Sequence, residues 1–200
     1  MSRTQLIYLM LTICSSLQLA HAQTNLQAAK MDTLLNSLAQ HNKIWGSVAF
    51  RHNGQTTYTR ATGYAWDGFN KANPETTYRI GSITKVFTSV MVQQLAEEGK
   101  IKLEAPLSNW FPDVPNAQRI TLLNLLQHSS GLHNFTDDEA YIGWMTQPQS
   151  QAKMLQLFAE QKPDFEPGAK HEYSNTNYVL LGFLIEKLDK RSYDHRPMFR

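Results

Sequence analysis

Residues 80–85 read Ile-Gly-Ser-Ile-Thr-Lys, and they lie where the pattern of the sequence changes from extended to helical. A short extended run over residues 76–80 leads into them. Apolar residues then recur at helical spacing, at Val86, Val90, Met91 and Leu95. Gly99 is placed to end this helix. The stretch therefore predicts a turn from a strand into a helix, with Ser82 at the start of the helix.

Ser82 and Lys85 are three positions apart, so on a helix their side chains share one face and the amine can reach the hydroxyl. The start of a helix also offers free N–H groups and the positive end of the helix dipole. Both favour negative charge on the serine oxygen and on an oxyanion formed after attack. The spacing predicts a nucleophilic serine with an amine as its proton partner.

A second Ser-x-x-Lys, formed by Ser150 and Lys153, shows that the spacing alone is a weak signal. We interpret Ser150 as the N-cap of a helix and Lys153 as a solvated lysine. Ser82 differs because Gly81 precedes it, because the pattern switches there from strand to helix, and because chemically suitable partners follow downstream.

The first of these partners is the sequence Tyr173-Ser174-Asn175. In an extended backbone the tyrosine and the asparagine point the same way. A phenol could transfer a proton there, and an amide could hold a lysine or a substrate carbonyl. The plainer interpretation makes Tyr173 a half-buried aromatic and Asn175 the N-cap of the next helix. The capping and chemical roles are compatible.

Taken together, the motifs closely resemble the serine β-lactamase-like superfamily, in the branch that contains class C β-lactamases, D-alanyl-D-alanine carboxypeptidases and related esterases. The motifs follow in family order over roughly residues 46–188. They are residues 80–85, Leu-Leu-Gln-His-Ser-Ser-Gly-Leu at 125–132, Glu-Pro-Gly at 166–168, Tyr-Ser-Asn at 173–175 and Tyr-Val-Leu-Leu-Gly at 178–182. The resemblance implies a serine acyl hydrolase acting on β-lactams, D-Ala-D-Ala peptides or small esters, with no cofactor.

The resemblance also implies a role for each site residue. Ser82 is expected to be the acylated nucleophile, and its backbone N–H half of the oxyanion hole. Lys85 is expected to be its proton partner, and Tyr173 the general base and acid. Asn175 is expected to orient Lys85 and the acyl amide. His128, within residues 125–132, is expected to be a packing histidine.

One family motif is missing from the expected position. A Lys/His-Thr/Ser-Gly strand should follow the Tyr-x-Asn loop, but residues 176–200 contain none. The C-terminal strands, the second oxyanion donor and the carboxylate-binding residues are then missing too. We expect a truncated or frame-shifted chain that hydrolyses nothing efficiently by itself. The alternative function is therefore an inactive fragment, or a non-catalytic relative that binds peptidoglycan or another ligand.

The remaining patterns predict an α+β fold of β-lactamase/transpeptidase type. A helix over residues 26–40 precedes two strand-like runs, 46–51 and 56–65, joined by Asn53-Gly54, a strong hairpin signal. A helical region covers about residues 100–170, with Thr121 and Ser150 as candidate N-caps. A final amphipathic helix is expected over residues 177–188.

The first 22 residues have the pattern of a secretory signal. Arg3 is followed by the apolar run 6–14, and Ala20-His21-Ala22 offers small residues at a cleavage site. We expect cleavage after Ala22, leaving one partial hydrolase domain over residues 23–200 in the periplasm or outside the cell. A buried N-terminal helix, a short anchor or a lipoprotein signal with Cys14 as the lipid-bearing residue are the alternatives.

Composition excludes several other classes of protein. The 19 Lys and Arg against 17 Asp and Glu form no basic or acidic block, which argues against a nucleic-acid or polybasic membrane surface. One cysteine allows no disulfide framework within the chain. The seven histidines are scattered, so no metal is implied. The expected partner is a small-molecule or peptidoglycan-derived substrate, with no membrane span after signal cleavage.

Overall fold

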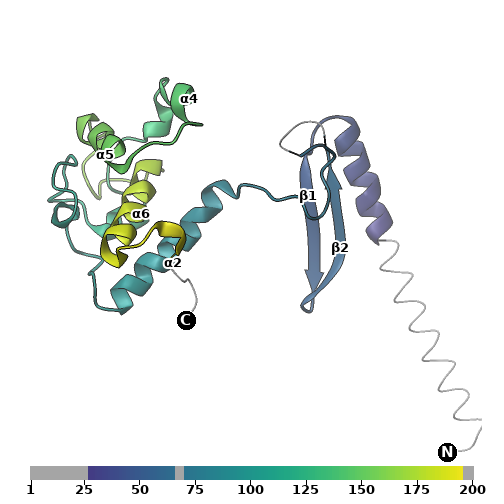
Figure 1. Cartoon of the computed structure of the whole chain (residues 1–200), viewed down its shortest axis with the longest axis horizontal. Helices are drawn as coiled ribbons and strands as arrows, with labels where there is room; N and C mark the ends of the chain where they lie inside the picture. Colours follow the sequence, from purple (N-terminus) through teal and green to yellow (C-terminus); the bar gives the residue numbers. More distant parts are fainter. Residues whose placement is uncertain (1–26, 66–69, 196–200) are drawn as a thin grey trace, which may run out of the picture. The chain divides into compact units, whose positions relative to one another are not determined.

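The computed structural model describes residues 27–65 and 70–195, which belong to two compact units (Figure 1). The N-terminal unit ends at Arg79, and the C-terminal unit begins at Ile80. The expected signal, residues 1–22, lies outside the described residues. No helix in the described part of the chain is both long enough and apolar enough to cross a bilayer.

The N-terminal unit contains a helix over residues 27–40 and an antiparallel hairpin of β1 (Gly46–His52) and β2 (Gln55–Thr62). The hairpin confirms the turn predicted at Asn53-Gly54. These two residues have φ values of 48° and 77°, the left-handed conformation that a two-residue turn of this kind requires. Gly63, with φ 79°, follows the end of β2, so the strand stops three residues before the expected Ala65.

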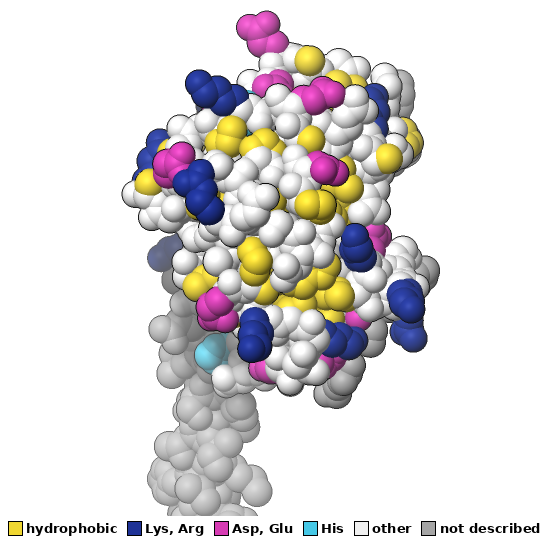
Figure 2. Space-filling view, turned by 90° about the vertical axis from the view of Figure 1, so that its left-hand side faces the viewer, with side chains coloured by type: hydrophobic (Ala, Val, Ile, Leu, Met, Phe, Trp, Pro, Cys, Tyr) yellow, Lys and Arg dark blue, Asp and Glu magenta, His cyan; other side chains and the backbone are white. Residues whose placement is uncertain are grey.

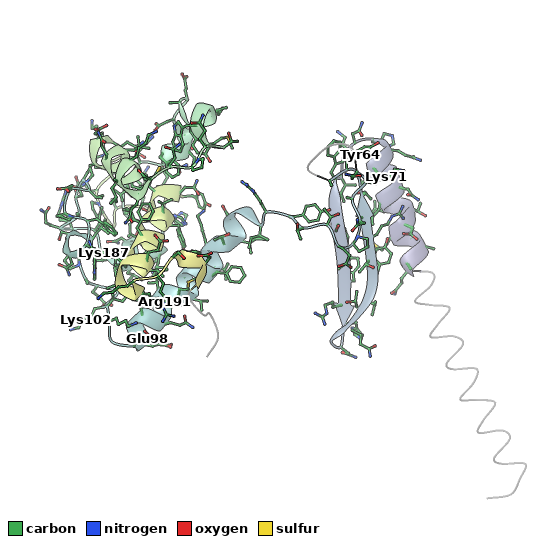
Figure 3. The ribbon with its side chains drawn as sticks, in the orientation of Figure 1. Tyr64, Lys71, Glu98, Lys102, Lys187 and Arg191 are labelled. Atoms are coloured by element: carbon green, nitrogen blue, oxygen red, sulfur yellow. The ribbon has the colours of Figure 1, made fainter. Side chains whose placement is uncertain are left out.

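An isolated antiparallel bridge joins Tyr64 to Lys71, which Figure 3 labels side by side. The expected extended run over residues 76–80 forms no strand, because nothing in the described residues supplies a ladder for it. A turn precedes the run instead: the Asn73 side-chain oxygen accepts from the Glu75 N–H at 2.8 Å. The phenol of Tyr78 hydrogen-bonds Ser47 Oγ at 2.9 Å, which ties the run to β1.

In the C-terminal unit, the turn η1 (Gly81–Ile83) leads directly into helix α2 (Thr84–Glu97), as the sequence predicts. Gly99 ends α2 with φ 71°, and the N–H groups of residues 99 and 100 return to the carbonyls of residues 96 and 95. The buried face of α2 carries Thr88, Met91, Val92 and Leu95. Val86 and Val90 were expected on the same apolar stripe, but they lie on another face, 63% and 40% exposed.

The rest of this unit is a succession of short helices and loops. Its elements are η2 (Leu107–Asn109), α3 (Leu122–Leu126), η3 (Phe135–Asp137), α4 (Tyr141–Trp144), α5 (Gln151–Glu160), α6 (Asn175–Asp189) and η4 (Tyr193–His195). Both predicted caps are confirmed: Thr121 Oγ1 accepts from the Asn124 N–H in a capping box, and Ser150 Oγ accepts from the Lys153 N–H. The prediction of Asn175 as an N-cap is wrong, since α6 begins at Asn175 and Ser174 takes that position.

The core of this unit forms where α2, α3 and α6 pack together. Its fully buried members include Leu95, Leu125, Leu181 and Leu184. On the face shown in Figure 2, basic and acidic side chains are intermixed between apolar ones, in line with the balanced charge of the sequence. This core fixes the start of α2 against the start of α6, where the predicted site residues lie.

Candidate active site

The start of α2 brings Ser82 and Lys85 into contact, as their spacing predicts. Lys85 Nζ donates to Ser82 Oγ at 3.1 Å. Ser82 lies in the η1 turn directly before α2, at the end of the helix where backbone N–H groups lack partners within the helix. Gly81 precedes it with φ 54°, a left-handed conformation in which a Cβ is unfavourable.

The loop before α6 brings Tyr173 and Asn175 to the same place. The phenol oxygen of Tyr173 lies 2.8 Å from Ser82 Oγ. Asn175 Oδ1 accepts from Lys85 Nζ at 2.7 Å. All four predicted site residues therefore form one connected cluster within the C-terminal unit, although about ninety residues separate the two pairs in sequence.

Two residues that the sequence analysis missed fix the orientation of the Asn175 amide. Its Nδ2 donates to Asn134 Oδ1 at 3.2 Å and to Thr136 Oγ1 at 3.0 Å. Its backbone N–H also donates to Asn134 Oδ1, at 2.9 Å. Because the amide nitrogen is held on this side, Oδ1 is presented to Lys85. No spacing pattern connects residues 134 and 136 with 175, so the sequence alone offered no signal for this support.

The environment of Tyr173 favours loss of its phenol proton. Burial acts to raise the pKa of this phenol, but hydrogen bonding with Lys85 and Ser82, together with the Lys85 charge, lowers the pKa below its ordinary value. Lys85 Nζ also lies 4.9 Å from the centre of the Tyr173 ring. Tyr173 is consequently better suited to exchange protons with Ser82 than an isolated tyrosine.

The second Ser-x-x-Lys pair has no comparable surroundings. Ser150 Oγ accepts from the Lys153 backbone N–H at 3.2 Å, which is the bond of an N-cap. Both residues are exposed. The interpretation of Ser150 as a cap and Lys153 as a solvated lysine is confirmed.

A groove of about 720 Å³ opens beside the cluster. Ser82 lines it from η1, and Lys85 and Asn175 line it from α2 and α6. Phe135, Thr136 and Tyr141 line it from η3 and α4. Its volume is in the range of small-molecule sites. Among residues 27–65 and 70–195, no three His, Cys, Asp or Glu side chains are grouped so that they could hold a metal ion.

His133 stabilises the loop between α3 and η3, which leads to the groove residues Phe135 and Thr136. Its Nδ1 lies 3.0 Å from Asp164 Oδ1, and its Nε2 lies 3.1 Å from Asp138 Oδ1. The His133 carbonyl accepts from Thr176 Oγ1 at 2.6 Å, which connects the same residue to the first turn of α6. Burial lowers the pKa of His133, but the hydrogen bonds that the ring donates to the Asp164 and Asp138 carboxylates outweigh this effect and leave the pKa above its ordinary value.

We expect His133 to stabilise the C-terminal unit most below its unfolded pKa of about 6.5. This contribution should be lost as pH rises through the higher folded pKa, because the imidazolium that satisfies both aspartates then loses a proton. Chemical denaturation of wild type and His133→Gln from pH 5 to 9 measures it, and the stability difference should shrink toward alkaline pH. A difference that grows with pH would contradict the assignment.

The fold and this cluster define a member of the serine β-lactamase and penicillin-binding protein superfamily, as the motifs predicted. More specifically, the family model described as Beta-lactamase matches residues 25–195, so the chain belongs to that family. The match also confirms the expected fold class, since solved structures of the superfamily align with the chain.

Three relatives illustrate the similarity. The probable fimbrial assembly protein FimD, serogroup H1, of Dichelobacter nodosus is 32% identical over 168 residues, which are 80% of this chain and 42% of that protein. Teichoic acid D-alanine hydrolase of Staphylococcus aureus is 30% identical over 162 residues, 80% of this chain and 38% of that protein. The D-amino acid amidase of Ochrobactrum anthropi SV3, solved with D-phenylalanine, is 31% identical with a TM-score of 0.65, covering 78% of this chain and 44% of that one. The chain thus spans less than half the length of these relatives.

Proposed function

We propose that the protein is a serine acyl hydrolase in which Ser82 forms an acyl-enzyme. The observation that carries the proposal is the position of Ser82 Oγ, which lies 2.8 Å from the Tyr173 phenol and 3.1 Å from Lys85 Nζ. A hydroxyl held between a phenol of lowered pKa and an amine has both a proton acceptor and a cation beside it.

In the first half of the reaction, Ser82 Oγ attacks the acyl carbon while its proton passes to the ionised Tyr173 phenolate. The Ser82 N–H at the start of the helix stabilises the oxyanion. Tyr173 then gives the proton to the leaving nitrogen or oxygen, whose bond to the acyl carbon breaks. In the second half Tyr173 takes a proton from water, which attacks the acyl-enzyme, and the proton returns to Ser82. Lys85, held by Asn175, keeps its charge directed at the Ser82–Tyr173 pair.

The family motifs suggest β-lactams, D-Ala-D-Ala peptides or esters as substrates. Of the acyl groups in these compounds, we favour a D-aminoacyl group, carried as an ester or an amide. The names of two relatives, a teichoic acid D-alanine hydrolase and a D-amino acid amidase, support this choice. The signal-like residues 1–22 support export to the periplasm or the medium, where such substrates would be met.

Mass spectrometry of the acid-quenched protein after reaction with a D-alanyl thioester tests the proposal. Trypsin would release Ser82 in the six-residue peptide 80–85 and Ser150 in a separate peptide ending at Lys153. We expect an alanyl adduct on the first peptide only, formed faster from the D- than from the L-thioester. Binding of the thioester without any adduct would instead show a non-catalytic relative and overturn the proposed function.

A further inference from the structure

His128 lies in the turn that follows α3, beside the cluster but not part of it. Its backbone has φ 53°, the left-handed region that residues other than glycine rarely adopt. Its ring packs against two tyrosine rings at tilts of 31° and 32°, with its centre 4.5 Å from that of Tyr173 and 5.0 Å from that of Tyr178. The expected packing role is therefore met, but one of the packed rings belongs to a proposed catalytic residue.

The backbone on both sides of Tyr173 is also bonded to His128. The N–H of Glu172 donates to the His128 carbonyl at 2.8 Å. The N–H of Ser174 donates to His128 Nδ1 at 3.2 Å. One residue thus holds the residue before Tyr173, the residue after it and the face of its ring.

A buried hydrogen-bond chain determines which form of the His128 ring is needed. The Leu132 N–H donates to Ser130 Oγ, and the Ser130 hydroxyl donates to Asn177 Oδ1 at 2.6 Å. The Asn177 amide nitrogen then faces His128 Nδ1 at 3.4 Å. Since Nδ1 accepts from Ser174 as well, it must carry no proton, and the neutral ring has its proton on Nε2.

We propose that neutral His128 is a positioning residue for Tyr173, which it holds against Ser82 by accepting hydrogen bonds from the N–H groups of Glu172 and Ser174 and by packing against the Tyr173 ring. The proposal rests on the function proposed above, because it gives Tyr173 the proton-transfer role. His128 itself touches neither Ser82 nor the substrate groove in the described contacts.

The charges around His128 favour its neutral form. Burial lowers its pKa first, and the charges of His171 and Lys85 lower it further. The other titratable groups beside it are the two phenols packed against its ring and Glu172, whose carboxylate accepts a hydrogen bond from Lys170. A proton on Nδ1 at low pH would displace the Ser174 N–H and release the Tyr173 loop. Acylation should therefore decline as pH falls through the folded pKa of His128, which lies below 6.5.

Two substitutions of His128 distinguish the effect of its hydrogen-bond acceptor from the effect of its ring. Both introduce a residue that tolerates positive φ. His128→Gly removes both the Nδ1 acceptor and the ring packing, whereas His128→Asn can offer Oδ1 to the Ser174 N–H and does not titrate. His171→Asn is the matched control, because the exposed His171 ring lies nearly perpendicular to that of His128, with 5.9 Å between the two ring centres.

The first measurement is the titration of Tyr173 in protein with ¹³C-labelled tyrosine, in which Tyr173→Phe assigns the signal. We expect the lowered pKa of Tyr173 in wild type, His171→Asn and His128→Asn, and a pKa closer to that of free tyrosine in His128→Gly. An unchanged Tyr173 titration in folded His128→Gly would overturn the proposal. This measurement needs no turnover, so it stands even if the proposed hydrolase activity fails.

The second measurement is the rate of acylation by the D-alanyl thioester from pH 4.5 to 8. We expect His128→Gly to lose about 10²-fold in rate through misplacement of the phenol, and His128→Asn to recover most of that loss. His128→Asn should also remove the part of the acid-side decline that follows the titration of His128, which wild type and His171→Asn show. If His128→Gly does not fold, the profile of His128→Asn decides: an acid limb identical to that of wild type would refute the positioning role.

Discussion

Ser82→Ala is expected to abolish covalent labelling by a fluorescent penicillin or a fluorophosphonate probe and to lower any ester turnover by more than about 10³-fold. The substitution removes a single oxygen, to which both Tyr173 and Lys85 are hydrogen-bonded. No other hydroxyl in the described residues is placed between a phenol and a lysine amine in this way. Labelling is read by gel fluorescence and by the mass of the intact protein.

Ser150→Ala is the matched control for this prediction, because Ser150 begins the other Ser-x-x-Lys and only caps α5. Its labelling should equal that of wild type, with a loss of about 1 kcal/mol in stability from the missing cap. The thermal unfolding of Ser82→Ala should remain close to that of wild type, since the lost hydrogen bonds are exposed. Persistent labelling of Ser82→Ala would remove Ser82 from the mechanism.

Gly131→Ala is expected to lower the free energy of unfolding of the C-terminal unit by about 2–5 kcal/mol. Gly131 has φ 78°, and a Cβ there would overlap the Phe165 carbonyl group, whose carbon lies only 2.9 Å away. The close approach is required because the Gly131 carbonyl accepts from the Asp164 N–H at 2.9 Å. A backbone hydrogen bond at this position leaves no room for a side chain.

Gly168→Ala separates the two causes. Gly168 has φ 81° and its N–H donates to the Ser129 carbonyl in the same pair of loops, but a Cβ there would meet nothing within 4 Å. It should cost only the backbone strain, about 1–2 kcal/mol. Urea unfolding of both variants and wild type gives the comparison. Equal losses in the two variants would show that the approach to Phe165 has no energetic weight.

Local signals in the sequence were sufficient for the hairpin and for the two side-chain caps. Asn53 and Gly54 both tolerate positive φ, and Thr121 and Ser150 supply an oxygen where a helix needs one. These features depend on interactions between residues close in sequence. Ser82 and Lys85 were predictable for the same reason, because helix geometry alone brings them together.

Other features depend on packing between distant segments and were not predictable. α2 is apolar on more than one face, so periodicity could not show that Met91 and Leu95 are buried while Val86 and Val90 are exposed. Ser and Asn are both common N-cap residues, so the sequence could not decide between Ser174 and Asn175. The Asn175 side chain does not cap α6 because it is hydrogen-bonded to Lys85 and Asn134 instead. Family order, rather than spacing, predicted that Tyr173 would belong with Ser82.

The loop between α3 and η3 carries His128 near one end and His133 near the other, and the two imidazoles prefer opposite protonation states. Acid protonates His128 and breaks its hydrogen bond with the loop that carries Tyr173. Alkali deprotonates His133 and weakens its interaction with Asp138 and Asp164. The cluster of Ser82, Lys85, Tyr173 and Asn175 should therefore be best ordered at an intermediate pH. A bell-shaped activity curve, the usual signature of an acid and a base reacting with substrate, would in this protein partly reflect the folding of a scaffold loop.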